Sequence, residues 1–378
     1  MAANVTLALV AGGGTGGHVC IGVAIAQAIR DLAPRHRIVL VGCRMDTDAP
    51  MMKQSRFPFY IVPACPWPGG FSWRRFPIYA WDAAVALASG LSALVRALVV
   101  LAQERPKVVI GTGGYGSAPA VVAAWLRGVP VLIHEPDSVI GLANRFLARF
   151  ARTITLGYGD VAAALPDGRT RATGNPVRRD FRTVRRAEAR RSLGIKPGQR
   201  LVVAFGGSQG SRTINQAVSR AAEALLRDGE THLLHVSGGR DYAMLQEAVK
   251  KMGEPVRERY RLYPHLDERE MATALAAGDA VVMRGGASAI AEAAATGIPA
   301  VVVPYPFARA QHQMSNARFL LDRKQGMVIE DKMLTPDVLS AAIERISREA
   351  VRRIDRRRRD SAGRVAGEAL ALAGVDLR

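Results

Sequence analysis

Three glycine-rich loops, each directly after a short apolar run, constrain this chain more than any other feature. They are the segments 12–17 (GGGTGG), 111–116 (GTGGYG) and 206–210 (GGSQG). Because glycine has no Cβ, such loops let backbone N–H groups approach an anion closely, and a helix that begins there adds a partial positive charge. Three loops spread over both halves of the chain predict a two-lobed protein that holds a phosphorylated ligand between its lobes.

Length and composition limit the class of protein. A chain of 378 residues suits two α/β domains, and 49% hydrophobic with 22% charged residues excludes disorder as the main state. The three cysteines, Cys20, Cys43 and Cys65, form no CxxC pair, which indicates a reducing, cytosolic compartment. The N-terminus lacks a basic region before its apolar run, and Asp82 and Arg96 interrupt the apolar stretch 81–101. We therefore expect no signal peptide and a soluble or peripheral protein.

The charge requires an anionic partner. The formal net charge is +19 and the pI is near 10.7, so nucleic acid, an anionic membrane surface and a phosphorylated substrate are the candidates. Part of this charge lies in the arginine-rich tail 352–359. A solvated helix face and a contact with lipid phosphates explain that tail equally well.

Apolar strand-like runs alternate with helical patterns along the whole chain. This alternation predicts parallel sheets covered on both faces, that is, doubly wound α/β domains. A Pro-containing, charge-rich segment near 174–177 marks the boundary between them. We expect an N-terminal domain over 1–176, a C-terminal domain over 177–345, and a C-terminal helix in 346–378 that packs back on the N-terminal domain. The expected strands are 5–10, 38–41, 108–110, 131–133, 201–205, 233–236, 280–283 and 300–303.

The first loop formally matches the dinucleotide fingerprint GxGxxG. An NAD site also needs an acid at the end of the second strand, whereas that strand ends here in Cys43-Arg44. His18 follows the loop directly, where an imidazole suits proton transfer or contact with a pyrophosphate. Asp46-Thr47-Asp48 resembles a metal-binding DxD pair, but the polar surroundings favour a solvated loop.

Two segments of the second half suit a sugar nucleotide. Glu292 lies about two turns into a helix that follows the strand 280–283, where a carboxylate can accept two ribose hydroxyls. The small residues before it let a pyrophosphate approach the helix N-terminus. Gln311, His312, Gln313 and Asn316 follow another strand and offer polar groups for sugar hydroxyls.

The segment 67–81 combines three of the four tryptophans with an arginine pair. Interfacial membrane anchors use this combination, with rings at headgroup depth and guanidinium on phosphate, and core packing explains the aromatics equally well. Base stacking also uses these residue types, but no nucleic-acid fold signature accompanies them, so we expect no nucleic-acid partner. The expected membrane contacts are Trp67, Phe71, Trp73, Arg74, Arg75 and Phe76.

Taken together, the motifs resemble the MurG family, the membrane-associated N-acetylglucosaminyltransferases of bacterial peptidoglycan synthesis in glycosyltransferase family 28. The matching segments cover nearly the whole chain in order. They are 10–19, 110–115, 134–135, 141–144, 173–178, 206–210 and 312–313.

The resemblance implies a GT-B fold: two Rossmann-like domains facing across a cleft, with a metal-independent site that needs no cofactor. It implies transfer with inversion from UDP-N-acetylglucosamine to lipid I (undecaprenyl-pyrophosphoryl-N-acetylmuramoyl pentapeptide), giving lipid II. The enzyme would lie at the cytoplasmic face of the inner membrane as a peripheral protein, with cell-wall synthesis proteins as further partners.

The resemblance also assigns roles to residues. His18 or Glu135 would be the base, and Tyr115 and Asn144 would serve the acceptor. Glu292 would hold the ribose and Gln313 the sugar. The implied donor-binding residues are Thr15, Gly16, Gly17, Asp137, Arg178, Ser208, Leu266, Ala287, Ser288, Ala289, Ile290, Ala291, Glu292 and Gln313.

The chain departs from the family pattern at a few positions. Pro136-Asp137 replaces the usual Gln-Asn, so that an acceptor-only carboxylate stands where an amide contacts the donor sugar; we expect a raised donor KM. Ala289 replaces a threonine and Ile21 a proline. The alternatives are a related GT-B transferase with another lipid or small-molecule acceptor, an NAD-dependent oxidoreductase, and a non-catalytic module that binds polyanions.

Overall fold

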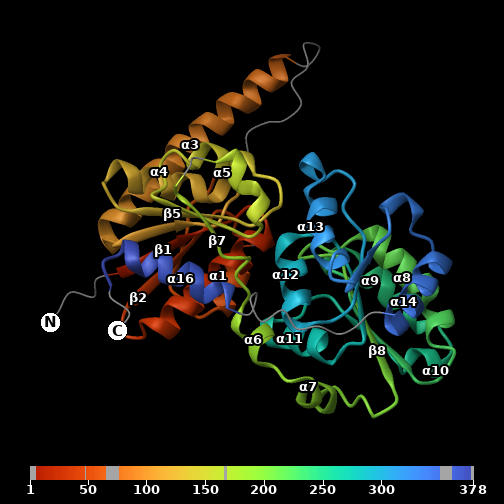
Figure 1. Cartoon of the computed structure of the whole chain (residues 1–378). Coiled ribbons are helices and arrows are strands. Elements are labelled where there is room, and N and C mark those ends of the chain that lie inside the picture. Colours follow the sequence, from red (N-terminus) through yellow and green to blue (C-terminus); the bar gives the residue numbers. More distant parts are fainter. Residues whose placement is uncertain (1–5, 47, 65–75, 166–167, 350–359, 376–378) are drawn as a thin grey trace. The chain divides into compact units, whose positions relative to one another are not determined.

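A computed structural model describes residues 6–46, 48–64, 76–165, 168–349 and 360–375 of the chain (Figure 1). The chain forms two compact units. Unit 1 comprises Met1–Pro176 together with Asp360–Arg378, and unit 2 comprises Val177–Arg359. The last helix of the chain thus belongs to the same unit as the N-terminus.

Unit 1 is built on a seven-stranded sheet in the order β3-β2-β1-β4-β5-β6-β7, in which every neighbouring pair is parallel. Side chains alternate between the two faces, so Ala8 and Val10 of β1 join one core cluster while Leu9 and Ala11 join the other. Both faces are covered, which explains the continuous apolar strands. The strands are β1 (Thr6–Ala11), β2 (Arg37–Gly42), β3 (Phe59–Ile61), β4 (Val108–Gly111), β5 (Val131–Glu135), β6 (Thr153–Leu156) and β7 (Thr170–Ala172).

Helices cover the two faces of this sheet in separate sets (Figure 1). On one face α1 (Gly16–Leu32) packs against α16 (Ser361–Leu372), whose Val365 and Leu370 are fully or almost fully buried. On the other face lie α3 (Phe76–Glu104), α4 (Ala118–Leu126) and α5 (Leu142–Leu147). The short α2 (Asp48–Gln54) follows β2.

Unit 2 repeats this plan with a six-stranded parallel sheet in the order β10-β9-β8-β11-β12-β13. Its strands are β8 (Arg200–Phe205), β9 (Thr231–Val236), β10 (Tyr260–Tyr263), β11 (Ala280–Met283), β12 (Ala300–Val302) and β13 (Gly326–Val328). Its helices are α6 (Arg179–Thr183), α7 (Arg186–Ser192), α8 (Arg212–Leu225), α9 (Gly239–Lys250), α10 (Glu254–Arg257), α11 (Glu268–Ala277), α12 (Ala287–Thr296), α13 (His312–Leu321) and α14 (Pro336–Glu349).

The predicted fold class is therefore confirmed: the chain contains two Rossmann-like units with parallel sheets. In each sheet the strand order reverses next to the first strand, between β1 and β4 in unit 1 and between β8 and β11 in unit 2. Ligands of such sheets bind at the carboxyl ends of the strands beside this reversal. The three glycine-rich loops follow β1, β4 and β8, which places each of them at this edge of its own sheet.

Candidate active site

The two glycine-rich loops of unit 1 interlock at the ends of the neighbouring strands β1 and β4. A Cβ on Gly14, which has a φ of 89°, would lie 2.5 Å from the ring of Tyr115. A Cβ on Gly114 would lie 2.4 Å from the carbonyl oxygen of Gly13. Thr112 Oγ1 donates to the carbonyl oxygen of His18 over 2.9 Å. Only glycine permits these approaches, so both loops keep their backbones close together.

His18 lies in the first turn of α1, against the second loop. Its Nδ1 is 2.9 Å from Thr15 Oγ1, and a Cβ on Gly113 would lie 3.2 Å from its Nε2. The His18 side chain is half-buried, whereas Thr15 and Gly17 are exposed and Gly16 is buried. Thr15 therefore contacts the imidazole at Nδ1, and the ring lies against Gly113 and Gly114 of the second loop.

Asp48 corrects the sequence-based interpretation of the DxD pair. The predicted solvated loop is wrong for this residue, because Asp48 is fully buried and begins α2. Its Oδ2 accepts hydrogen bonds from the backbone N–H groups of Gly14, Cys43 and Arg44, over 3.3, 2.9 and 3.0 Å. These donors compensate the buried carboxylate, so Asp48 fastens the first glycine loop to the end of β2.

Asp46 differs from Asp48, because its side chain is 62% exposed and pairs with Arg44. Among the described residues, no group of three or more His, Cys, Asp or Glu side chains is arranged to hold a metal ion.

Glu135 ends β5, the strand next to β4, and only 2% of it is exposed. Its Oε1 accepts from the N–H of Asp137 over 3.0 Å, and its Oε2 from the N–H of Gly141 and from Asn144 Nδ2, each over 3.0 Å. Burial raises the pKa of Glu135 to about 7; the three N–H donors oppose this rise and the charge of Asp137 adds to it. Glu135 thus changes its charge close to neutral pH.

Asn144, in the first turn of α5, connects Glu135 to the second glycine loop. Its Nδ2 also donates to the carbonyl oxygen of His134 over 2.9 Å, so both of its N–H hydrogens are used. A Cβ on Gly113 would lie 3.2 Å from this nitrogen and 3.2 Å from His18 Nε2. The structure thereby brings His18, Glu135 and Asn144 together, as the sequence predicted for a common site, with Tyr115 in the adjoining loop.

His134 is completely buried. Its Nδ1 is 3.0 Å from Thr155 Oγ1 and its Nε2 is 3.0 Å from Asn175 Oδ1, while Asn175 Nδ2 donates to the carbonyl oxygen of Pro136 over 2.8 Å. Sequence analysis assigned no role to Asn175, although it lies in a motif that the analysis singled out.

In unit 2, Glu292 lies in α12 and is 7% exposed. Arg178 Nη2 and Nε both donate to Glu292 Oε1, over 2.7 and 3.0 Å. Burial raises the pKa of Glu292, and the Arg178 guanidinium opposes that rise. The small residues Ala287–Ala291 form the first turns of the same helix, directly after Gly285-Gly286.

The remaining predicted donor residues lie at the carboxyl edge of the same sheet. Gln313 Oε1 accepts from the N–H groups of Gly285 and Tyr305, over 3.1 and 2.9 Å, and so joins the segments after β11 and β12. Ser208 is exposed in the loop after β8, and Leu266 follows β10 and packs against a core cluster.

Sequence analysis missed Arg284, the first residue after β11. Its Nη2 donates to Ser211 Oγ over 2.6 Å, and its Nη1 donates to the carbonyl oxygen of Val303 over 3.1 Å and pairs with Asp331. It fastens the segments after β8, β11 and β12 to one another. An arginine directly between an apolar strand and Gly-Gly was the only signal for this role.

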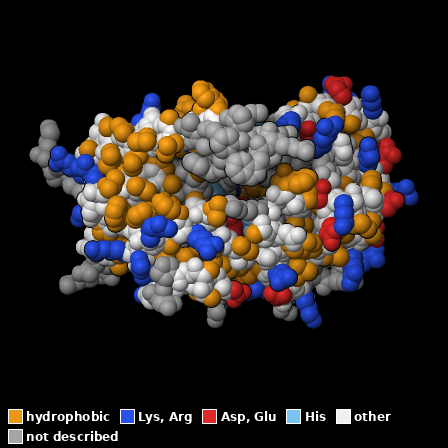
Figure 2. Space-filling model, turned by 90° about the horizontal axis from the view of Figure 1, so that it is seen from above, with side chains coloured by type: hydrophobic (Ala, Val, Ile, Leu, Met, Phe, Trp, Pro, Cys, Tyr) orange, Lys and Arg blue, Asp and Glu red, His pale blue; other side chains and the backbone are white. Residues whose placement is uncertain are grey.

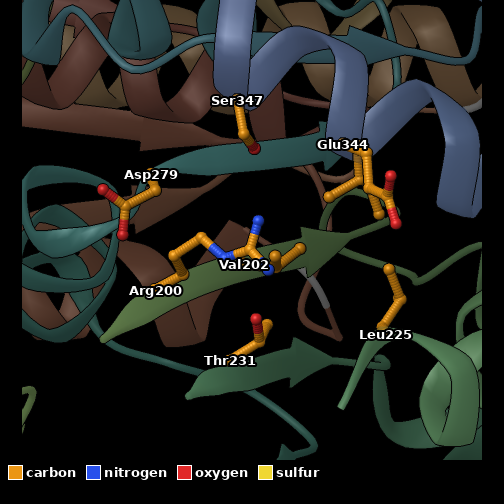
Figure 3. A pocket seen from close by; sticks show the side chains of 8 residues that line it. Arg200, Val202, Leu225, Thr231, Asp279, Glu344 and Ser347 are labelled. Atoms are coloured by element: carbon orange, nitrogen blue, oxygen red, sulfur yellow. The ribbon is translucent and has the colours of Figure 1, made fainter. Parts of the chain in front are cut away.

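A small hollow in unit 2 lies at the opposite, amino-terminal edge of the sheet, beneath α14 (Figure 3). Its charged lining residues are already paired: Arg200 with Asp228, Asp279 with Arg186 and Arg190, and Glu344 with Arg348. It is therefore no part of the candidate site. The lining residues are Arg200, Val202, Leu225, Thr231, Asp279, Ile343, Glu344 and Ser347.

Comparison with known proteins identifies the family. Residues 8–156 match the glycosyltransferase family 28 N-terminal domain, and residues 201–368 match the C-terminal domain of the same family. The chain is 36% identical, over 89% of its length and 88% of the relative's, to a protein of Desulforudis audaxviator. A protein of Nocardioides sp. is also 36% identical, over 91% of this chain and 90% of its own. Both carry the name UDP-N-acetylglucosamine--N-acetylmuramyl-(pentapeptide) pyrophosphoryl-undecaprenol N-acetylglucosamine transferase.

Solved structures agree in fold. The MurG structure from Acinetobacter baumannii has a TM-score of 0.65 at 22% identity, covering 97% of this chain and 99% of that one. A UDP-GlcNAc 2-epimerase from Neisseria meningitidis, bound to UDP-GlcNAc, has a TM-score of 0.66 at 11% identity, covering 97% and 99%. On the strength of its sequence relatives, the chain belongs to the MurG family within glycosyltransferase family 28.

Proposed function

We propose that this glycosyltransferase moves N-acetylglucosamine from UDP-N-acetylglucosamine to the muramoyl C4 hydroxyl of lipid I, with inversion, and so forms lipid II. The observation that carries the proposal is the set of polar side chains at the carboxyl edges of the two sheets. Unit 2 offers a buried carboxylate, Glu292, at a helix that begins with small residues. Unit 1 offers an imidazole beside two glycine-rich loops. These are the groups that a UDP-sugar and a hydroxyl nucleophile respectively require.

In the proposed donor site, Glu292 accepts the ribose hydroxyls. Both hydrogen bonds from Arg178 go to Oε1, which leaves Oε2 for the ligand. The N–H groups at the start of α12 face the pyrophosphate, and Gln313 presents its amide to the sugar. As the bond between the anomeric carbon and UDP breaks, negative charge grows on the pyrophosphate, where fixed N–H donors and the helix dipole stabilise it. This chemistry requires no metal, and we propose a metal-independent enzyme.

On the acceptor side, we assign the general base to His18. Its Nδ1 lies 2.9 Å from Thr15 Oγ1, a contact that orients the ring, and we assign the proton transfer to Nε2, the nitrogen on the side of Gly113. The hydroxyl oxygen of the acceptor attacks the anomeric carbon from the face opposite UDP, and its proton moves to Nε2. Glu135 is buried and holds three N–H donors, so we assign it a supporting role: its charge, conveyed through the Asn144 amide, favours the imidazolium.

We further propose that unit 1 binds the cytoplasmic face of the inner membrane. Apolar side chains of α3, α4 and α5 gather on one face of this unit (Figure 2). Arg149 stacks over the exposed ring of Phe146 at 4.6 Å, an arrangement that suits a lipid phosphate at the guanidinium and the ring at headgroup depth. The exposed members are Trp81, Val85, Leu87, Leu91, Val95, Val99, Trp125, Leu126, Leu142 and Phe146.

Within the described residues, α3 contains one stretch, Val85–Glu104, that is long and apolar enough to cross a membrane. We favour surface binding, because the inner side of the same helix contributes Ala93, Ala97 and Leu101 to the core of unit 1. Of the contacts predicted from the sequence, Trp67, Phe71, Trp73, Arg74 and Arg75 lie outside the described residues. Phe76 begins α3, and its side chain also lies outside them.

The proposal is tested by transfer of labelled N-acetylglucosamine from its UDP donor to a lipid I analogue, with EDTA present. We expect labelled disaccharide-lipid. His18→Ala should lower kcat about 10²- to 10⁴-fold, the usual contribution of a general base. His36→Ala is the matched control, because His36 is an exposed histidine of the same unit outside the site, and it should keep full activity.

Two negative results have different meanings. Thermal stabilisation by UDP-N-acetylglucosamine without transfer would show that the donor is right and the acceptor is another lipid or small molecule. The absence of both thermal stabilisation and transfer would refute the proposed donor.

A further inference from the structure

Asn175 is fully buried, one residue before the first segment of unit 1 ends at Pro176, and both the nitrogen and the oxygen of its side-chain amide have hydrogen-bonding partners. Its Nδ2 donates to the carbonyl oxygen of Pro136 over 2.8 Å, and its Oδ1 lies 3.0 Å from Nε2 of His134. Because an amide oxygen only accepts, this network assigns the hydrogen of His134 to Nε2 and makes Nδ1, 3.0 Å from Thr155 Oγ1, an acceptor. The orientation of the Asn175 side chain is therefore fixed.

The contact with Pro136 extends to Glu135 through a single peptide group. Its C=O, that of Pro136, accepts from Asn175, and its N–H, that of Asp137, donates to Glu135 Oε1 over 3.0 Å. Both polar groups of the Pro136–Asp137 peptide are thus held. A rotation of this peptide would break both bonds at once.

The surrounding chain is shaped to admit the Asn175 side chain. Gly157, directly after β6, leaves the space, since a Cβ there would lie 2.2 Å from Asn175 Oδ1. The N–H of Gly157 donates to the carbonyl oxygen of Glu135 over 2.8 Å. On the other side, Arg364 of α16 donates from Nε to the carbonyl oxygen of Thr173 over 3.0 Å. The segment 173–175 is therefore held between α16 and the end of β5.

The geometry points to Asn175 as a positioning residue for Glu135: by fixing the Pro136–Asp137 peptide, it sets the hydrogen bonding of the Glu135 carboxylate. This inference rests on the proposed function only for its kinetic consequence. Asn175 touches neither reacting group in this scheme.

The charged and titratable groups around Glu135 determine the expected sign. Asp137 acts on it through its charge, His134 precedes it on β5, and His18 lies beyond the Asn144 amide; the neighbouring β6 and α5 contribute the uncharged Thr155 and Asn144. The N–H of Asp137 stabilises the ionised form of Glu135. Losing this bond therefore raises the pKa of Glu135, and the carboxyl titrates at a higher pH.

The experiment compares Asn175→Ala with the wild-type protein, following the Glu135 carboxyl by carbon-13 NMR and assigning its signal with Glu135→Gln. We expect the titration to move to higher pH. In the transfer assay, the acidic limb of kcat should also move to higher pH. We expect kcat to fall roughly 10- to 100-fold, because the Glu135 carboxylate is misplaced, and the donor KM to stay unchanged. The NMR titration needs no substrate, so it separates failure of this inference from failure of the proposed function.

Asn215→Ala is the matched control. Asn215 is likewise fully buried, its Oδ1 lies 2.9 Å from Nε2 of His235, and its Nδ2 donates to a backbone carbonyl, but it belongs to unit 2. It should lower thermal stability without moving the Glu135 titration.

Gly157→Ala provides a second variant should Asn175→Ala fail to fold, because it displaces the Asn175 side chain without removing it; the same upward shift is expected. An unshifted Glu135 titration in a folded variant, or an equal shift in Asn215→Ala, would overturn the inference.

Discussion

Asp137 stands where the sequence analysis expected an amide, and its charge acts on a neighbouring carboxyl. Burial raises the pKa of Glu135 to about 7, and the charge of Asp137 adds to this rise. Asp137→Asn removes the charge and keeps the backbone N–H that donates to Glu135, so the pKa of Glu135 should fall. The acidic limb of the pH profile of kcat should then move to lower pH, the opposite direction from Asn175→Ala.

The same substitution tests the sequence-based expectation that Asp137 weakens donor binding. Restoring an amide should lower the donor KM, because the repulsion between the carboxylate and the pyrophosphate is removed. Steady-state kinetics between pH 5 and 9 measure both effects. An acidic limb of kcat that stays at the same pH or moves to higher pH would contradict the assigned influence of Asp137 on Glu135.

How far single residues could be predicted depended on where their partners lie in the chain. His18 and Glu292 were predictable because each follows a strand and a run of small residues in the sequence itself. Asp48, Asn175 and Arg284 were not, because each is held by at least one segment that is distant in the sequence: Asp48 by Gly14, Asn175 by Pro136 and Arg284 by Ser211. Arg284, for example, contacts Ser211, 73 positions earlier in the chain.

At the scale of elements, most inner strands were predictable, whereas β6 and several edge strands were not. β1, β4, β8 and β11 are continuous apolar runs because both faces of their sheets are covered. β3, β7 and β13 have three residues each and no fully buried ones, so no periodic pattern marks them. The long helix α3 is buried on one side and exposed on the other. Its inner side joins the core, and its outer side exposes Leu91 (56%) and Val95 (57%).

This two-sided helix gives the prediction for membrane binding. Leu91→Glu with Val95→Glu places two charges on the exposed apolar face and should strongly weaken co-sedimentation with vesicles that contain anionic lipid. Thermal stabilisation by the UDP donor should persist, because Glu292, Arg178 and Gln313 of the proposed donor site belong to unit 2 and Asp137 lies outside α3. Val338→Glu, at an exposed position of α14 in unit 2, is the matched control and should bind vesicles like the wild type. Unchanged co-sedimentation of the double variant would refute the membrane face.

At the scale of the whole molecule, the chain closes unit 1 with its last helix, which returns after the entire unit 2 has been formed. Val365, Ala366, Ala369 and Leu370 of α16 are buried in the same cluster as the side chains of α1. Unit 1 therefore cannot complete this core cluster until residues 361–372 are available. The two units otherwise have separate cores, so we expect each to unfold with its own stability.

Leu370→Ala tests this arrangement, because the four tryptophans all lie between residues 67 and 125, in unit 1. Tryptophan fluorescence in a denaturant titration consequently reports unit 1, whereas circular dichroism reports both units. Removing the Leu370 side chain from a fully packed cluster should cost about 2–5 kcal/mol and shift the fluorescence transition to lower denaturant.

Leu339 is an equally buried leucine of unit 2. Leu339→Ala should therefore shift the unfolding of unit 2, which circular dichroism detects, and leave the fluorescence transition of unit 1 unchanged. If both substitutions move both signals together, the two units unfold as one. The α16 contact would then stabilise the entire chain rather than unit 1 alone.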